Sequence, residues 1–341
     1  MKEWNWSLED LNQINKNGYK VFSCFSCGGG STMGYKLAGF EVLGNVEIDP
    51  EMMKLYKKNH NPKYPFEMPI QDFKKIANQE LPNDLFNLDI LDGSPPCSTF
   101  SISGVRDKKW GGEFSFKEGQ TKQKLDDLFF DFIDVVEKLR PKVVVAENVK
   151  GLITGKAKGY VHEIIKSFSK IGYEVQLFLL NSATMGVPQK RERVFFVAYK
   201  KELLFPKLYL NFKEAPILYK EVRTGKGKPI NPETETYKRW LRRRPADQNI
   251  GDVTQRESGK DSNFNTVFIK DNRVANTIAS GSGLLRYDVP EQISSEDIIR
   301  IQTFPYDYDF MDQNIQYVCG MSVPPVMMKK IAEQIYLQWF K

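Results

Sequence analysis

Residues 19–30 read YKVFSCFSCGGG, an apolar run followed directly by three glycines. The apolar run predicts a buried β-strand, and the glycines allow a tight turn that opens a helix. A backbone without side chains also lets a ligand approach the helix N-terminus closely. The pattern predicts the first strand–loop–helix unit of an α/β fold, with Gly28 and Gly30 as candidate cofactor-binding residues.

Apolar runs and amphipathic stretches alternate over residues 1–200, which predicts parallel strands connected by helices. Strands are expected at residues 19–25, 41–46, 88–92, 143–146, 173–180 and 193–199. The strongest helical pattern covers Lys124–Arg140, where apolar side chains recur at helical spacing and Pro141 follows. Helical patterns return at residues 297–303 and 325–339.

Positive charge is concentrated in a segment that follows this regular part of the chain. The chain has 49 Lys and Arg against 43 Asp and Glu, and residues 206–290 hold 16 and 10 of them, the whole excess of +6. This segment is also irregular in pattern, which indicates a second domain. A basic module is typical of a surface that faces a polyanion such as nucleic acid. A solvated basic surface without a ligand is the alternative.

The composition excludes several classes of protein. A length of 341 residues allows one large domain and a smaller one. No apolar run approaches 18 residues and the chain does not begin with a signal peptide, so we expect a cytoplasmic protein without membrane contact. Four cysteines are too few for a disulfide framework. Only two histidines are present, so no metal site is expected and acid–base chemistry falls to other groups.

An acidic residue ends the second expected strand. Glu47 stands 17 residues beyond Gly30, in the position where a carboxylate accepts hydrogen bonds from ribose hydroxyls. Together with the glycine loop, it predicts a site for a nucleoside cofactor. Asp72 is a candidate for contacting the exocyclic amine of an adenine, and an aspartate in a surface loop is the alternative.

Residues 92–101 read DGSPPCSTFS and follow another apolar run. Two prolines fix φ and remove backbone donors, so the loop is stiff and directs Cys97 to one place. The pattern favours a nucleophilic cysteine. A buried free cysteine in a tight turn is the alternative.

Glu147 ends the strand expected at 143–146. Because strands of an open α/β sheet present their carboxyl ends at one crevice, we expect Glu147 and Cys97 to face the same space. A thiolate that adds to C6 of a pyrimidine, with a carboxylic acid at N3, turns C5 into a nucleophile. Arginines in the segment 189–193 could clamp the base, orient Glu147 or hold a nucleic-acid backbone. An ordinary strand-end carboxylate and a solvated basic edge are the alternatives.

Together these segments resemble the cytosine-5 DNA methyltransferases in order and spacing over nearly the whole chain. The matching segments are residues 25–34, Glu47, Asp72, 95–97, 147–149, 189–193, 295–305 and 320–325. The resemblance implies a doubly wound, Rossmann-like sheet that binds S-adenosylmethionine, with a smaller, irregular target-recognition domain. Two positions depart from the family pattern: Cys27 replaces a usual glycine, and Met321 replaces a common asparagine.

The resemblance also implies roles for individual positions. Cys97 would be the nucleophile, Glu147 the partner of cytosine N3, and Arg193 a residue that positions the base. The implied cofactor-binding residues are Phe25, Gly28, Gly30, Glu47, Asp72, Leu128, Ser322 and Val323.

The sequence therefore predicts a DNA (cytosine-5-)-methyltransferase that acts as a monomer on double-stranded DNA, either beside a cognate restriction endonuclease or as an orphan enzyme. Residues 1–205 plus 310–341 would form the catalytic domain, and residues 206–309 the target-recognition domain. One rival is a tRNA cytosine methyltransferase of the same fold, against which the large basic segment argues. The other is a non-catalytic, cofactor-sensing DNA-binding protein, against which the complete set of Cys97, Glu147 and Arg193 argues.

Overall fold

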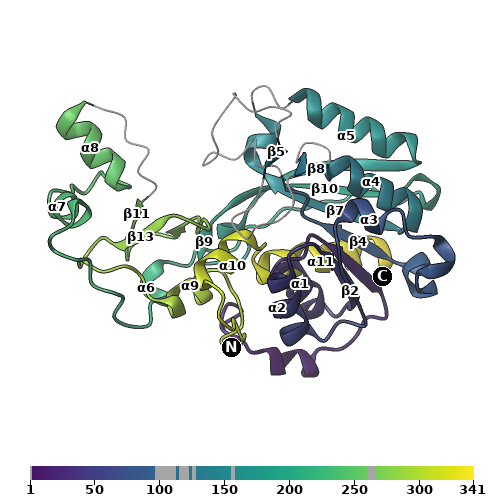
Figure 1. Cartoon of the computed structure of the whole chain (residues 1–341), viewed down its shortest axis with the longest axis horizontal. Helices are drawn as coiled ribbons and strands as arrows, with labels where there is room; N and C mark the ends of the chain where they lie inside the picture. The colour runs from purple at the N-terminus through teal and green to yellow at the C-terminus, as the bar shows by residue number, and fades with distance from the viewer. Residues whose placement is uncertain (1, 97–112, 115–122, 125–127, 155–157, 260–265) are drawn as a thin grey trace. The chain divides into compact units, whose positions relative to one another are not determined.

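The computed structural model describes residues 2–96, 113–114, 123–124, 128–154, 158–259 and 266–341 (Figure 1). Cys97, the expected nucleophile, lies outside the described residues. The chain packs into two compact units. The sheet unit contains residues 9–181, 192–211 and 328–341, and the smaller unit contains residues 1–8, 182–191 and 212–327.

Seven strands of the described residues form one sheet in the sheet unit, in the order β3-β2-β1-β4-β7-β10-β8. They are β1 (Lys20–Cys24), β2 (Glu41–Glu47), β3 (Tyr64–Glu67), β4 (Ile90–Gly93), β7 (Val143–Val149), β8 (Tyr173–Asn181) and β10 (Glu192–Lys200). The first four and β7 pair in parallel. From β1 the chain first adds strands on one side of the sheet, to β3, and then on the other side, from β4 onward. This strand order confirms the doubly wound α/β fold expected from the sequence.

Two features of the sheet were not predicted. β10 runs antiparallel to both of its neighbours, whereas the sequence pattern indicated parallel strands throughout. The segment 182–191 that joins β8 to β10 is too short for a crossover helix, and antiparallel strands need none. The strand β3 reads YPFE, without an apolar run, and its proline is tolerated because the strand lies at the edge of the sheet.

Helices cover both faces of this sheet. The principal ones are α1 (Gly30–Leu37), α2 (Pro50–His60), α3 (Ile70–Phe73), α4 (Leu128–Leu139), α5 (Lys158–Lys170) and most of α11 (Pro325–Ile335), which continues into the π-helix η9 (Tyr336–Phe340). Shorter 3-10 turns are η1 (Leu8–Gln13), η2 (Asn78–Glu80), η3 (Asn83–Asn87), η5 (Lys150–Ile153) and η8 (Lys201–Leu203). Asp49 caps α2 by accepting hydrogen bonds from the backbone N–H groups of Glu51 and Met52, and Pro50 occupies the first helical position.

The predicted start of the helix at Lys124 was wrong. Gln123–Lys124 form the short strand β6, which pairs with β5 (Glu113–Phe114), and α4 is described from Leu128. Its end agrees with the sequence to within one residue, because Arg140 has a left-handed φ of 51° and breaks the helix.

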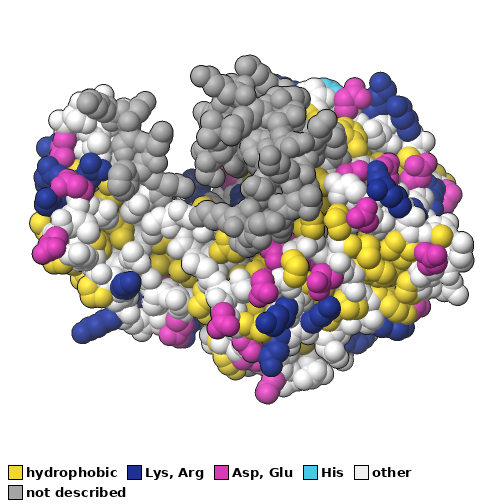
Figure 2. Space-filling model, in the orientation of Figure 1, with side chains coloured by type: hydrophobic (Ala, Val, Ile, Leu, Met, Phe, Trp, Pro, Cys, Tyr) yellow, Lys and Arg dark blue, Asp and Glu magenta, His cyan; other side chains and the backbone are white. Residues whose placement is uncertain are grey.

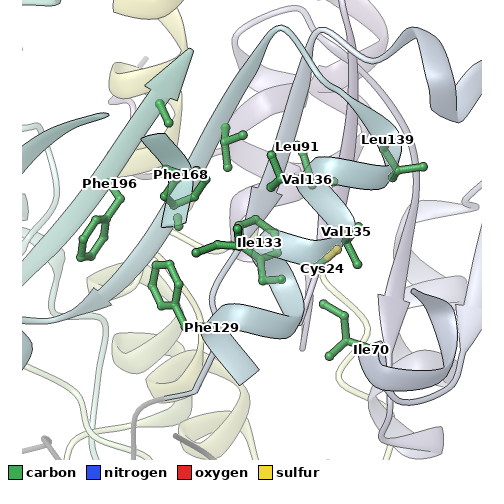
Figure 3. Packing of buried hydrophobic residues seen from close by; sticks show 14 of the residues in the cluster. Cys24, Ile70, Leu91, Phe129, Ile133, Val135, Val136, Leu139, Phe168 and Phe196 are labelled. Carbon is green, nitrogen blue, oxygen red and sulfur yellow. The ribbon is translucent and has the colours of Figure 1, made fainter. Parts of the chain in front are cut away.

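The apolar face of α4 forms the centre of the hydrophobic core. Phe129, Ile133, Val136 and Leu139 point toward the strands, where Leu91 and Phe196 meet them (Figure 3). Gly93 at the end of β4 belongs to the same face, since a Cβ at that position would meet the ring of Phe132. Side chains alternate along β4, so Asp92 lies on the opposite face, where it contacts Tyr35 of α1.

The smaller unit is built from short elements. They are η7 (Ser182–Thr184), β9 (Gln189–Lys190), α6 (Tyr219–Val222), α7 (Glu235–Leu241), α8 (Ile250–Ser258), β11 (Thr266–Ile269), β12 (Ala275–Asn276), β13 (Gly283–Arg286), α9 (Ser295–Ile301) and α10 (Ile315–Met321). β11 pairs in parallel with β13, and β9 with β12. Trp240, Ile250, Val253, Phe268 and Leu285 form a small core of its own. In the described part of the chain, no helix has the length and apolar character needed to cross a membrane.

Gly93→Ala is expected to lower the free energy of unfolding by about 1–3 kcal/mol, because overpacking forces buried groups apart. The new Cβ would lie 2.5 Å from Cε2 of Phe132, which is fully buried. Gly159→Ala in α5 is the matched control, since nothing lies within 4 Å of a Cβ there and alanine favours a helix. Urea denaturation measures both variants, and equal stabilities would contradict the packing argument.

Candidate active site at the carboxyl edge of the sheet

The candidate site residues of the sheet unit stand where its parallel strands end. Glu47 is the last residue of β2, the glycine loop follows β1, and Glu147 lies near the end of β7. Parallel strands bring these ends to one edge of the sheet. The order reverses between β1 and β4, and the edge beside such a switch point is where open α/β sheets bind ligands.

The glycine loop has an unusual backbone. Phe25, Cys27 and Gly29 all have left-handed φ angles, of 57°, 45° and 77°. Gly29 cannot be replaced without displacing its surroundings, because a Cβ there would lie 2.1 Å from Nε2 of His60. The sequence singled out Gly28 and Gly30, which are buried, but it missed Gly29 as the glycine that the conformation requires.

Glu47 ties the end of β2 to this loop. Its Oε2 accepts a hydrogen bond of 2.8 Å from the backbone N–H of Cys27, and its Oε1 accepts one of 3.1 Å from that of Asp49. The side chain is 8% exposed, and burial raises the pKa of Glu47 against the effect of these N–H groups. Each carboxylate oxygen can accept a second hydrogen bond, so the group can also receive ligand hydroxyls. This contact uses the backbone of Cys27 and not its side chain.

The ring of His60 packs against the glycine loop. It is buried at the end of α2, and its Nε2 lies 3.2 Å from the carbonyl oxygen of Gly28. Burial, assisted by the charge of Lys36, lowers the pKa of His60 to about 3, so the ring is neutral at physiological pH. A ring nitrogen that carries hydrogen can donate to the Gly28 carbonyl. Sequence reasoning gave His60 no role, since a lone histidine at a helix end carries no local pattern.

Glu147 and Arg193 meet across β7 and β10. Nε of Arg193 lies 2.9 Å from Oε1 of Glu147, and the two side chains are 15% and 11% exposed. Burial lowers the pKa of Arg193, and the charge of Glu147 opposes this shift. The next residue, Asn148, donates a hydrogen bond of 3.1 Å to the carbonyl oxygen of Pro95, in the loop that leads to Cys97. A buried, oriented carboxylate thus lies beside the base of the expected nucleophile loop.

The polar residues of the segment 189–193 contact different parts of the structure. In the smaller unit, Gln189 donates to Gln302 at 2.6 Å, and the buried Arg191 donates to the carbonyl oxygens of Ile278 and Gly320 at 3.2 and 3.0 Å. Arg191 is therefore a packing residue of that unit. Of the possibilities open from the sequence, orientation of Glu147 is the one that the contact of Arg193 supports.

Five other predicted cofactor residues have less specific surroundings. Phe25 is half-buried and packs against the core, and Leu128 is buried at the first described turn of α4. Asp72 is exposed in α3 and forms an ion pair of 3.3 Å with Lys75. Ser322 and Val323 are buried in the smaller unit, where the Ser322 hydroxyl donates to the Val318 carbonyl. Among the residues described, no cluster of His, Cys, Asp and Glu is suited to hold a metal ion.

The three consecutive arginines of the smaller unit have different environments. Arg243 stacks on Trp240, with its guanidinium carbon 3.4 Å from the ring centroid, and it donates to the Tyr287 carbonyl. Arg242 pairs with Glu257 at 3.1 Å, whereas Arg244 is exposed. Around α7 and α8, at the left of Figure 2, Lys and Arg side chains lie beside acidic ones. The net positive charge of the segment is therefore partly neutralised locally.

Comparisons with known proteins agree with this architecture. The family model described as C-5 cytosine-specific DNA methylase matches residues 19–337. Type II methyltransferase M.FnuDI of Fusobacterium nucleatum is 34% identical over 54% of this chain, which spans only 48% of that relative. Type II methyltransferase M.AplI of Arthrospira platensis is 27% identical over 97% of this chain and 90% of its own length. The solved structure of a Spodoptera frugiperda DNMT2 variant, 16% identical, shares the fold with a TM-score of 0.63 over 94% of this chain and 100% of that one.

The buried His60 predicts a specific acid sensitivity. Between an ordinary pKa of 6.5 and about 3, the unfolded chain takes up a proton that the folded protein does not. Stability is therefore lost as the pH falls through this window, by about 1.4 kcal/mol per pH unit from this group. His60→Gln should abolish that component of the pH dependence, measured by chemical denaturation from pH 7 to pH 4.5. His162→Gln, at an exposed position, is the control, and identical profiles for both variants would contradict the prediction.

Proposed function

We propose that this chain, which belongs to the C-5 cytosine-specific DNA methylase family, transfers a methyl group from S-adenosylmethionine to C5 of a cytosine flipped out of duplex DNA. The observation that carries the proposal is the buried ion pair of Glu147 and Arg193. It lies next to the hydrogen bond that the Asn148 side chain donates to the carbonyl oxygen of Pro95. A flipped base is required because C6 is attacked perpendicular to the ring, and stacking blocks that path in the duplex.

The glycine loop and Glu47 fit the proposed cofactor. S-adenosylmethionine has a ribose with two vicinal hydroxyls, and the carboxylate of Glu47 retains acceptor capacity beyond its two backbone contacts. The absence of a side chain at Gly29 lets the loop lie against His60. Phe25, Gly28, Gly30, Asp72 and Leu128 of the sheet unit are proposed to complete the pocket, and the cofactor role of Ser322 and Val323, which belong to the smaller unit, stays a proposal from the family resemblance. When bound, the cofactor supplies an electrophilic methyl group.

Three residues carry the proposed chemistry. The thiolate of Cys97 adds to C6 of the cytosine while Glu147, in its proton-bound form, hydrogen-bonds N3, so that the electron density needed for methyl transfer develops at C5. Arg193 holds the carboxyl group of Glu147 in place through Nε. After the methyl group is transferred, water removes the C5 proton and the Cys97 thiolate leaves, which restores the aromatic ring.

The smaller unit is the proposed site of target recognition, within residues 206–309, and residues 1–205 plus 310–341 form the proposed catalytic domain. The excess positive charge of residues 206–290 supports binding to a polyanion. Relatives include Type II methyltransferases and the orphan methyltransferase M.SPRI of Bacillus phage SPR. We infer that the chain acts as a monomer on cytoplasmic double-stranded DNA, within a restriction-modification system or alone.

Glu147→Gln is expected to reduce the rate of single-turnover methyl transfer to DNA by at least about a hundredfold, since the amide cannot supply the proton at N3. Cofactor binding, measured by calorimetry, should remain unchanged. Cys97→Ala should abolish transfer altogether. Transfer to tRNA rather than DNA by the wild-type protein would refute the proposed substrate.

A trapping experiment checks the nucleophile independently. DNA with 5-fluorocytosine cannot lose its C5 substituent, so the wild-type protein should remain covalently attached to it. Peptide mapping should place the adduct on Cys97. An adduct on Cys24, Cys27 or Cys319 would assign the nucleophile elsewhere.

Arg244 and Arg243 should differ in their effects on DNA binding. Arg244→Ala, at an exposed position, should reduce the slope of log affinity against log salt by about one if the side chain neutralises a phosphate. Arg243→Ala should instead destabilise the smaller unit, because its guanidinium packs on Trp240 and Tyr287. Salt titrations of DNA binding, together with thermal denaturation, separate the two effects. An unchanged slope and unchanged sequence preference for Arg244→Ala would mean that this arginine is only solvated.

A further inference from the structure

Asp92 carries a buried carboxyl group that has no role in the reaction proposed above. It lies in β4, five residues before Cys97, and is 2% exposed. Oδ2 accepts a hydrogen bond of 2.8 Å from the hydroxyl of Ser23, and Oδ1 accepts one of 3.3 Å from the hydroxyl of Tyr35. Asp92 therefore connects three elements: β1, β4 and the helix α1 that opens at the glycine loop.

The strand register places Asp92 close to Glu147. Asp92 is paired with Val145 on the neighbouring strand β7, and Glu147 follows Val145 by two residues. Residues two apart on a strand share a face, so the two carboxyl groups lie on the same face of the sheet, on neighbouring strands. Arg193 approaches Glu147 from β10, the strand on the other side of β7.

Several titratable groups of the described residues interact with Asp92. The titratable groups that interact electrostatically with it are Cys24 from β1, Tyr35 from α1, Tyr56 from α2 and Glu147 from β7. Burial raises the pKa of Asp92 to about 7, with a further contribution from the negative charge of Glu147, while the hydroxyls of Ser23 and Tyr35 oppose the shift. Asp92 thus changes its charge within the range of pH in which enzymes usually work.

We propose that Asp92 is a positioning residue that acts through Glu147, by making the proton-bound form of Glu147 more favourable when Asp92 is ionised. Repulsion between two carboxylates on neighbouring strands is mutual. Asp92 itself exchanges no proton with the substrate. This inference rests on the proposed role of Glu147 at cytosine N3 and adds a second acid that adjusts it.

The test compares wild-type protein with Asp92→Asn, which keeps the size and hydrogen-bonding capacity of the side chain but cannot ionise. Single-turnover methyl transfer is measured from pH 6 to pH 8.5 with saturating cofactor and DNA. The ratio of the wild-type rate to the variant rate should rise by about fivefold or more with pH, with a midpoint near pH 7. A ratio that is constant with pH would reduce Asp92 to a structural role and overturn the inference.

Two further variants make the outcome specific. Ser23→Ala removes a hydrogen bond that favours ionised Asp92, so the pH midpoint of the rate rise in this variant should lie above that of the wild-type protein, while the rise itself remains. An unmoved midpoint would overturn the inference, and Ser23→Ala decides the question if Asp92→Asn does not fold. Asp89→Asn is the control, since this buried acid pairs with Lys142 and should give a ratio independent of pH. The same pH-dependent ratio for Asp89→Asn would also overturn the inference.

The failure of this inference differs from the failure of the proposed function. A wild-type protein that transfers no methyl group to DNA refutes the proposed function, and the role of Asp92 falls with it. A wild-type protein that methylates DNA, with a constant rate ratio for Asp92→Asn, refutes the role of Asp92 alone.

Discussion

The sheet unit depends on the burial of β7 between β4 and β10. Val143, Val144, Val145 and Ala146 have no exposed surface, because neighbouring strands border them and other elements cover both faces. A strand buried on both faces tolerates few polar side chains before it reaches an edge. The change from apolar to polar residues at Glu147 is therefore where the strand first presents chemistry. At this point Arg193 pairs with Glu147. The next residue, Asn148, donates a hydrogen bond to the carbonyl oxygen of Pro95.

Charge at this edge is maintained at a cost to stability. The ion pair of Glu147 and Arg193 is largely buried, and replacement of such pairs by apolar side chains is often neutral or stabilising. Asp92 adds to the cost. Because its pKa is raised from 3.8 to about 7, the folded protein holds a proton that the unfolded chain releases, and stability falls as the pH rises through this interval. Groups with such a cost, at the edge of the sheet proposed to bind the ligands, are better explained by function than by folding.

Local patterns predicted what depends on local sequence. Apolar runs located six strands of the sheet, and the residues that end them, Glu47 and Glu147, were found from the same runs. The reversed direction of β10 and the contacts of His60 and Asp92 depend on residues brought together from distant segments, which a single sequence does not reveal. Asp92 follows an apolar run, and in the sequence a single acidic residue at that place indicates only the end of a strand. The role of Cys97 stays a prediction, since this residue lies outside the described part of the chain.

The two arginines of the segment 189–193 show how a short spacing can serve two units of the structure. Arg191 is bonded within the smaller unit, to carbonyl oxygens of Ile278 and Gly320, and Arg193 is paired within the sheet unit, to Glu147. One residue separates them, so any insertion or deletion here would misplace at least one guanidinium. A shift by a single residue would also turn β10 over, because alternate side chains of a strand point to opposite faces. The spacing is therefore constrained jointly by the packing of one unit and by the chemistry proposed for the other.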